Sequence, residues 1–218
     1  MISWFDITTA GSFSIMAPAA AVVAVWLALN RAWQLVLWWC LLFIAAMGLA
    51  VASKIAFIGW GIGIRSLNFT GFSGHALRTA SVVPVLLYLL LQKTTSAPRK
   101  LGILLGLAFA ILIGWSRLAV NAHSVSEVVA GWLLGTSVSL GFIWILSHSP
   151  KIELNPWVIM LSLIGLLATP NIAPVPTQRW ITEAALYISG HDRPYIRATW
   201  KMAAIKSRLS YSDLGNSW

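Results

Sequence analysis

Charged residues are scarce in this chain, and acidic residues are the scarcest of them. Lysine and arginine together number 15, aspartate and glutamate only 6, and the four types make up 10% of the 218 residues. A soluble domain carries about 25% charged residues, so the composition excludes an ordinary soluble protein. Hydrophobic residues instead make up 58% of the chain, and several of their runs are long enough for membrane-spanning helices, which need roughly 18 or more apolar residues. The sequence therefore predicts a polytopic membrane protein.

Cysteine is also scarce, and the first residues do not resemble a cleaved signal peptide. Cys40 is the only cysteine and lies within an apolar run, so an intrachain disulfide is excluded and cysteine usage gives no indication of the compartment. The first residues, M-I-S-W-F-D, lack the basic region that opens a cleaved signal peptide. We therefore expect the first apolar helix to direct membrane insertion.

Six apolar segments are predicted to span the membrane, which makes the expected fold all-α. They lie at about residues 13–29, 33–53, 75–91, 101–115, 125–146 and 156–169. Residues 55–74 are rich in glycine and too broken for a clean span. Irregular backbone survives at membrane depth only where it is buried in protein or faces water, so we expect a loop or re-entrant segment over a functional site. Residues 1–170 then form one six-helix domain, followed by a basic, aromatic tail at 171–218.

Basic residues in short turns predict the orientation. The turns on one side of the predicted membrane carry Arg31, Lys93, Arg99, Lys100 and Lys151. Short basic loops stay in the cytoplasm, so the other ends of the helices are expected outside. If the sixth segment spans, the tail lies outside at the membrane surface, with its aromatic rings in the interface and its basic groups on lipid headgroups. If that segment does not span, the tail lies inside.

The formal net charge of +9 has a membrane explanation. The basic residues lie at helix ends and in the tail, where anionic headgroups would surround them. We therefore expect the membrane, and not nucleic acid, as the partner of these charges.

The segment Ser116–Glu127, S-R-L-A-V-N-A-H-S-V-S-E, concentrates charged and titratable groups between two apolar runs. If His123 opens a helix, Glu127 lies one turn further on the same face. Its carboxylate can accept the proton of one imidazole nitrogen, which fixes the tautomer and leaves the other nitrogen free to attack. Arg117 offers a planar fork of donors that suits phosphate or carboxylate oxygens.

A second polar cluster stands at the start of the third predicted span. It reads Ser73-Gly74-His75, and Lys54 lies nineteen residues before Ser73. In the six-span arrangement, Lys54 ends the second span and His75 begins the third, while Arg117 ends the fourth and His123 begins the fifth. All of these residues therefore fall on one face of the membrane, where they can form one site.

Together the two clusters resemble the type 2 phosphatidic acid phosphatase superfamily, which are membrane lipid-phosphate phosphatases. The family pattern is a Lys followed seven residues later by Arg-Pro, then P-S-G-H, then S-R-x5-H-x3-D. The third part matches at Ser116, Arg117 and His123, with Glu127 in place of Asp. The second part matches as S-G-H, with Phe72 in place of Pro.

The first part of the pattern is degenerate in this chain. Lys54 is present, but seven residues later the chain has Gly61 where the family has arginine. The next arginine is Arg65, which is followed by Ser66 and not by proline. Arg65 either replaces the missing arginine through a folded loop or anchors that loop, and the sequence leaves both alternatives open.

The resemblance implies a role for each matched residue. His123 would attack phosphorus and form a phosphohistidine, with Glu127 orienting it, and His75 would protonate the leaving alkoxide and then activate water. The implied phosphate ligands are Lys54, Arg117, Ser73, Gly74, Ser116 and, if it replaces the missing arginine, Arg65. No cofactor or metal is expected, because these cations supply the charge. Two histidines without a nearby cysteine also make a closed zinc site a poor explanation.

The resemblance implies hydrolysis of a phosphorylated membrane lipid at the outer face of a bacterial inner membrane. Candidate substrates are undecaprenyl diphosphate, phosphatidic acid, phosphatidylglycerol phosphate and lipid A phosphates. One alternative is transfer of the phosphoryl group to another lipid through the same phosphohistidine. Another is a non-catalytic protein that binds or carries anionic lipids, which the degenerate first part of the pattern would suit.

Overall fold

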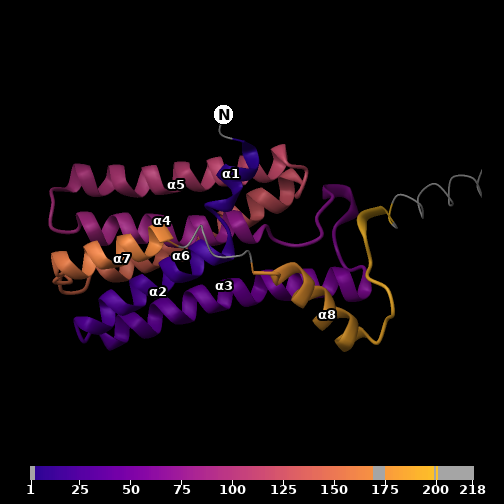
Figure 1. The fold of residues 1–218 in the computed structure, drawn as a ribbon, viewed down its shortest axis with the longest axis horizontal. Coiled ribbons are helices and arrows are strands. Elements are labelled where there is room, and N and C mark those ends of the chain that lie inside the picture. The colour runs from indigo at the N-terminus through magenta and orange to yellow at the C-terminus, as the bar shows by residue number, and fades with distance from the viewer. Residues whose placement is uncertain (1–2, 169–174, 199, 201–218) are drawn as a thin grey trace, which may run out of the picture.

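The computed structural model describes residues 3–168, 175–198 and 200 of the chain. In this part of the chain the long helices form a bundle and run nearly parallel or antiparallel to one another (Figure 1). The helices are α1 (Trp4–Thr9), α2 (Phe13–Leu29), α3 (Trp33–Trp60), α4 (Gly74–Leu91), α5 (Ser96–Ala119), α6 (Val125–Ser147), α7 (Pro156–Ala168) and α8 (Thr177–Ser189), with a short 3-10 turn at Arg65–Leu67. The predicted all-α fold is confirmed.

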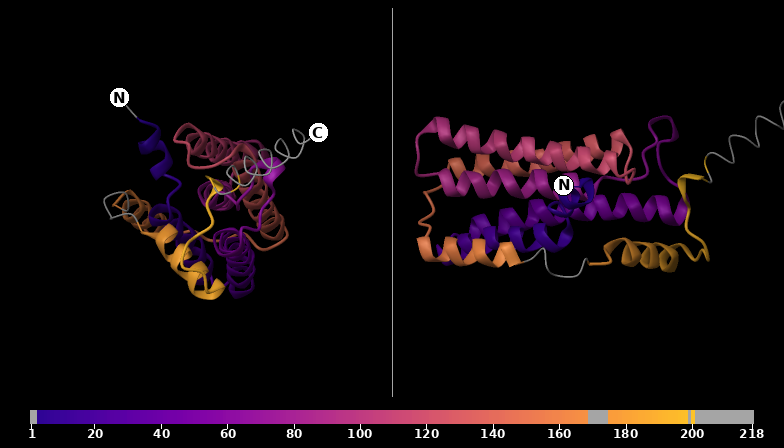
Figure 2. Two further views of the ribbon diagram at one scale, coloured as in Figure 1. Left: turned by 90° about the vertical axis from the view of Figure 1, so that its right-hand side faces the viewer. Right: turned by 45° about the horizontal axis from the view of Figure 1, so that its top comes forward.

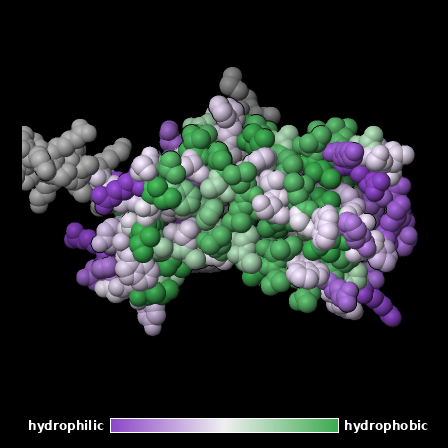
Figure 3. Space-filling view, turned by 180° about the vertical axis from the view of Figure 1, so that it is seen from behind, coloured by the Kyte–Doolittle hydropathy of each residue, from purple (hydrophilic) through white to green (hydrophobic). Residues whose placement is uncertain are grey.

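Five segments are long and apolar enough to cross a membrane, one of them formed by α1 and α2 together. The sixth predicted span corresponds to α7, which has 13 residues. At 1.5 Å per residue it is about 20 Å long, shorter than the roughly 30 Å of a bilayer core. On the face shown in Figure 3, hydrophobic residues cover the middle of the molecule and hydrophilic residues gather at its two ends. The chain is thus a multi-pass membrane protein.

The second predicted span was too short, because α3 continues through Lys54 to Trp60. The added residues, 55–60, are apolar apart from Gly59. One glycine costs only about 1 kcal/mol in a helix, and here its missing side chain lets α8 pack closely, since a Cβ at Gly59 would lie 3.1 Å from Cβ of Ser189. The helix ends at Gly61, which adopts the left-handed conformation typical of a helix terminus. The glycine-rich loop is therefore confined to residues 61–73.

Helix α4 lies at the centre of the bundle and packs against α5 and α6. Glycines allow the close approach. A Cβ at Gly131 would lie 2.6 Å from the carbonyl oxygen of Ser73, and one at Gly135 would lie 2.3 Å from that of Leu77. Small residues four apart let helix backbones meet in this way. The contact fixes the start of α6 beside the start of α4, where the two polar clusters of the sequence lie.

The connections define two ends of the bundle. The loop from α3 to α4 and the turn from α5 to α6 lie at one end, here called the motif end (Figure 1). The turns from α2 to α3, α4 to α5 and α6 to α7 lie at the other end, as the second view also shows (Figure 2). That end is held by an ion pair between Lys93 and Glu153 at 2.6 Å and by hydrogen bonds between Gln92 and the backbone of Ile152.

The described part of the C-terminal region returns to the motif end. Helix α8 packs along the last turns of α3 (Figure 1), and residues 190–198 continue across the end of that helix. The predicted boundary between membrane domain and tail at residues 170–171 lies outside the described residues, as do residues 201–218 of the tail.

Candidate active site

The start of α6 fixes the geometry of His123 and Glu127. Ser124 is the N-cap of α6, and its hydroxyl accepts a hydrogen bond from the backbone of Glu127, while the Glu127 carboxylate accepts from the backbone of Ser124. This reciprocal capping box holds the carboxylate one turn above His123. Nδ1 of His123 lies 2.8 Å from Oε2 of Glu127. Because a carboxylate only accepts, Nδ1 carries the proton and Nε2 keeps its lone pair.

Glu127 is fully buried, and donors from two other parts of the chain surround it. The backbone N–H of Thr70 donates to Oε1 at 2.8 Å, and the Thr70 hydroxyl also donates to this oxygen. Arg197 forms an ion pair with Oε2, the oxygen that His123 contacts. A buried carboxylate requires this kind of compensation. The glycine-rich loop and the C-terminal segment thus both hold the group that orients His123.

Burial also controls the protonation of His123, which lies between α5 and α6. Removal of the imidazole from water lowers its pKa below the ordinary value, and the hydrogen bond to Glu127 offsets only part of this effect. The ring is therefore neutral near pH 7. A neutral ring with Nδ1 bonded to a carboxylate has a nucleophilic Nε2.

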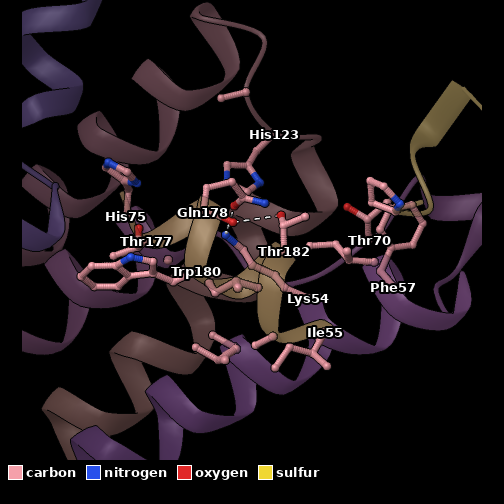
Figure 4. A pocket seen from close by; sticks show the side chains of 18 of the residues that line it. Lys54, Ile55, Phe57, Thr70, His75, His123, Thr177, Gln178, Trp180 and Thr182 are labelled. Carbon is pink, nitrogen blue, oxygen red and sulfur yellow. Dashed lines mark hydrogen bonds between the residues drawn. The ribbon is translucent and has the colours of Figure 1, made fainter. Parts of the chain in front are cut away.

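Helices α3, α4 and α5, the turn before α6 and the C-terminal segment bring cationic and titratable side chains to a cavity of about 910 Å³. Those that line it include Lys54, His75, Arg78, Arg117, His123 and Arg197. Figure 4 shows Lys54 extending toward His123, with His75 on one side and Thr70 on the other. The ammonium group of Lys54 also donates to Oε1 of Gln178 on α8 at 3.5 Å. Such a concentration of positive charge beside a neutral imidazole suits an anionic group such as phosphate.

The N-terminal residues position two of these arginines. Arg117 donates to the hydroxyl of Thr8 at 3.0 Å, and Arg78 donates to the carbonyl of Gly11 at 3.3 Å. The Arg78 guanidinium also lies 5.7 Å from the ring centre of Phe13, a cation–π distance. Both guanidinium groups are therefore fixed before any ligand arrives.

Ser73 and Gly74 lie at the N-terminus of α4, next to this cavity. Ser73 is the N-cap residue, and its backbone N–H donates to the carbonyl of Glu127 at 3.0 Å. Its buried hydroxyl has no hydrogen-bond partner among the described residues. Gly74 lines the cavity and begins the helix. Free N–H groups at a helix N-terminus favour bound anions.

Two other predicted ligands lie away from the cavity surface. The hydroxyl of Ser116 is buried and donates to the carbonyl of Ile113 at 2.6 Å. The exposed Arg65 has its guanidinium 5.7 Å from the ring centre of Trp200. Neither residue is among those that line the cavity.

Metal ligands are not grouped in this site. Among residues 3–168, 175–198 and 200, no three His, Cys, Asp or Glu side chains lie close enough to hold a metal ion.

Comparison with known proteins shows the family of this chain. The model of the PAP2 superfamily matches residues 65–151, which contain His75, His123 and Glu127. An uncharacterized 22.5 kDa protein in the cps region of Klebsiella pneumoniae is 35% identical over 201 residues, covering 90% of this chain and 96% of that protein. The chain belongs to the PAP2 superfamily.

Two further relatives of this PAP2 chain have names that describe an activity. Phosphatidylglycerophosphatase B of Bacillus subtilis is 31% identical over 74 residues, 33% of this chain and 36% of that protein. Undecaprenyl-diphosphatase of Sulfolobus acidocaldarius is 37% identical over 83 residues, 37% of this chain and 36% of that protein. No solved structure matches the chain significantly.

Sequence reasoning missed several residues of this candidate site. Thr70, Arg197, Thr8 and Gln178 were not predicted, and three of them lie outside the region that matches the family model. Arg197 is separated from Glu127 by 70 residues, so no helical spacing connects them. The one available signal was compositional, because the tail is rich in arginine and lysine.

Proposed function

We propose that this protein is an integral membrane phosphatase that hydrolyses a lipid phosphate or diphosphate through a phosphohistidine at His123. The observation that carries the proposal is the His123–Glu127 pair at a cavity lined by Lys54, Arg117 and a second histidine, His75. Phosphoryl transfer needs a nucleophile, a proton for the leaving oxygen and positive charge around the phosphoryl oxygens. The site contains a side chain for each requirement.

The reaction proceeds in two displacements. Nε2 of His123 attacks phosphorus, the bond from phosphorus to the lipid oxygen breaks, and His75 gives its proton to that oxygen. The imidazolium that forms at His123 is stabilised by Glu127. His75, now neutral, removes a proton from water, which attacks the phosphohistidine and releases phosphate. Lys54, Arg117 and the N-terminus of α4 bind the phosphoryl oxygens in both steps.

The walls of the cavity support a lipid substrate. Away from the cations, apolar side chains of α3 and α8 form its lining, among them Met47, Val51, Ile55, Ile58, Trp180 and Ile181. A charged end and an apolar wall together suit an amphiphile with a phosphate headgroup. The names of the two relatives that match over shorter regions, a phosphatidylglycerophosphatase and an undecaprenyl-diphosphatase, support the same class. A non-catalytic lipid carrier needs no nucleophile, whereas the His123–Glu127 pair leaves Nε2 of His123 free to attack phosphorus.

The proposed location is a bacterial inner membrane, with the motif end outside. The opposite end carries the basic turns, which favour the cytoplasm. A phosphorylated lipid of the outer leaflet would then reach the cavity from the membrane.

Phosphate release by the detergent-purified protein tests this function. Undecaprenyl diphosphate, phosphatidic acid and phosphatidylglycerol phosphate are compared, each with and without a chelator. We expect release from at least one lipid, undiminished by the chelator, because protein cations supply the charge. Phosphate that appears on an added acceptor lipid instead of in solution would indicate the transferase. Loss on chelation would contradict the metal-independent mechanism.

The pH dependence of the reaction reports on His123. Protonation of Nε2 removes the nucleophile, so kcat/KM should fall at low pH. A free imidazole has a pKa of about 6.5. Because burial lowers the pKa of His123, we expect kcat/KM to fall only at pH values below this one. The pH profile of kcat/KM is measured with two substrates whose phosphates have different pKa values. A limb that is the same for both then belongs to the enzyme, and one that shifts belongs to the substrate. An acidic limb above about pH 7 that is common to both would contradict the assignment.

A further inference from the structure

The C-terminal segment carries a cation to the site that no membrane helix supplies. We propose that Arg197 is a phosphate-binding residue of this active site and that residues 190–198 exist in part to hold it there. This inference rests on the proposed function. Arg197 lines the cavity beside Lys54 and His123, yet it belongs to neither polar cluster of the sequence.

The segment is attached to the end of α3 by hydrogen bonds that this helix end requires. The last carbonyl groups of a helix have no partner within it. The carbonyl of Ile58 accepts from the backbone N–H of Tyr195 at 2.9 Å, and that of Gly59 accepts from Nδ1 of His191 at 2.7 Å. Residues 190–198 therefore cap α3, which gives Arg197 a defined position.

Residues 190–198 leave no room for a side chain at Gly61, the residue that ends α3. Its φ angle is +70°, and a Cβ there would lie 2.9 Å from the ring of Tyr195. Position 61 lies seven residues after Lys54, where the resemblance to the family places an arginine. No side chain fits there while Tyr195 is packed against it. Arg197, two residues beyond Tyr195, brings a guanidinium to the cavity instead.

Arg197 has donors to spare for a ligand. One terminal nitrogen makes both its ion pair with Glu127 and a hydrogen bond to the Thr70 hydroxyl at 3.4 Å. A guanidinium carries five N–H donors in a planar fork, and the Arg197 side chain is 33% exposed. Its remaining donors can bind phosphoryl oxygens while it stays beside Glu127.

The other arginines of the cavity are held by N-terminal residues. Arg78 is buried, bonded to Gly11 and placed beneath Phe13, and Arg117 is bonded to Thr8. Arg197 is the cavity arginine that comes from outside the five long apolar segments. We infer that it supplies the additional positive charge that the transferred phosphoryl group requires in the transition state.

Binding and turnover of Arg197 variants test the inference, with Arg193→Ala as the matched control. Arg193 lies in the same segment but does not line the large cavity. We expect Arg197→Ala to lower kcat/KM by about 10²- to 10³-fold and to weaken binding of inorganic phosphate, measured by calorimetry, by about tenfold. Arg193→Ala should stay within about twofold in both. Arg197→Lys should keep only part of the activity and phosphate affinity that Arg197→Ala loses, because an ammonium lacks the planar fork of donors.

Adding guanidinium ion to the Arg197→Ala variant distinguishes a phosphate-binding role of Arg197 from a structural one. Guanidinium that restores part of both the activity and the phosphate affinity of Arg197→Ala supports a direct role in phosphate binding, because restoring the ion pair with Glu127 alone would not raise the affinity. A loss of activity that guanidinium does not restore, with unchanged phosphate affinity, would assign Arg197 to structure and overturn the inference. Wild-type protein that binds phosphate through Arg197 but releases none from any lipid would overturn the proposed function and not this inference.

Discussion

Replacing His123 by alanine is expected to abolish phosphate release, with a loss on the order of 10⁴-fold or more, because the variant has no nucleophile. The remaining groups would still bind substrate, so the effect should appear in kcat. Radiolabelled lipid phosphate offers a second readout. Wild-type protein quenched during turnover should carry label in an acid-labile, alkali-stable bond, and His123→Ala should carry none.

The fold should survive this change, which makes the result interpretable. Without His123, Glu127 keeps its contacts with Thr70, Ser124 and Arg197, and the N-terminus of α6 stays capped. His148→Ala is the matched control, since His148 caps the far end of the same helix and is exposed. Label retained on His123→Ala, or equal losses in both variants, would refute the phosphohistidine assignment.

Replacing His75 by alanine should give the second large effect, with a different signature. Turnover of a lipid phosphate should fall by about 10²- to 10⁴-fold, because the alkoxide then leaves without a proton. With p-nitrophenyl phosphate, whose leaving group needs no proton, the first displacement should proceed. The second should remain slow, because no base activates water. His75→Ala should therefore accumulate labelled phosphohistidine, in contrast to His123→Ala.

The two histidine variants are informative together. A burst of p-nitrophenol equal to the enzyme concentration, followed by slow turnover, would support the assignment of His75 to the second step. A His75→Ala protein that releases p-nitrophenol without a burst, and carries no more label than wild type, would exclude that role.

The sequence by itself determined the long apolar helices and the local part of the site. Long apolar runs must bury their backbone polar groups in helices when they cross a bilayer, so the α-helical fold was predictable. His123 and Glu127 were also predictable as a pair, because a spacing of four residues after a helix start places them one turn apart. The end of α3 could not be predicted correctly, because a single glycine in an apolar run, Gly59, does not distinguish a helix from a loop.

Only the tertiary structure decided which distant groups complete the site. Thr70 reaches Glu127 because the loop at 61–73 folds over the start of α6, and Arg197 reaches it because residues 190–198 cap α3. Likewise, Thr8 meets Arg117 because α1 packs beside α5. Such contacts leave no periodic signal in the sequence. They depend on which buried polar group needs a partner after the helices have packed, and packing is a property of the whole chain.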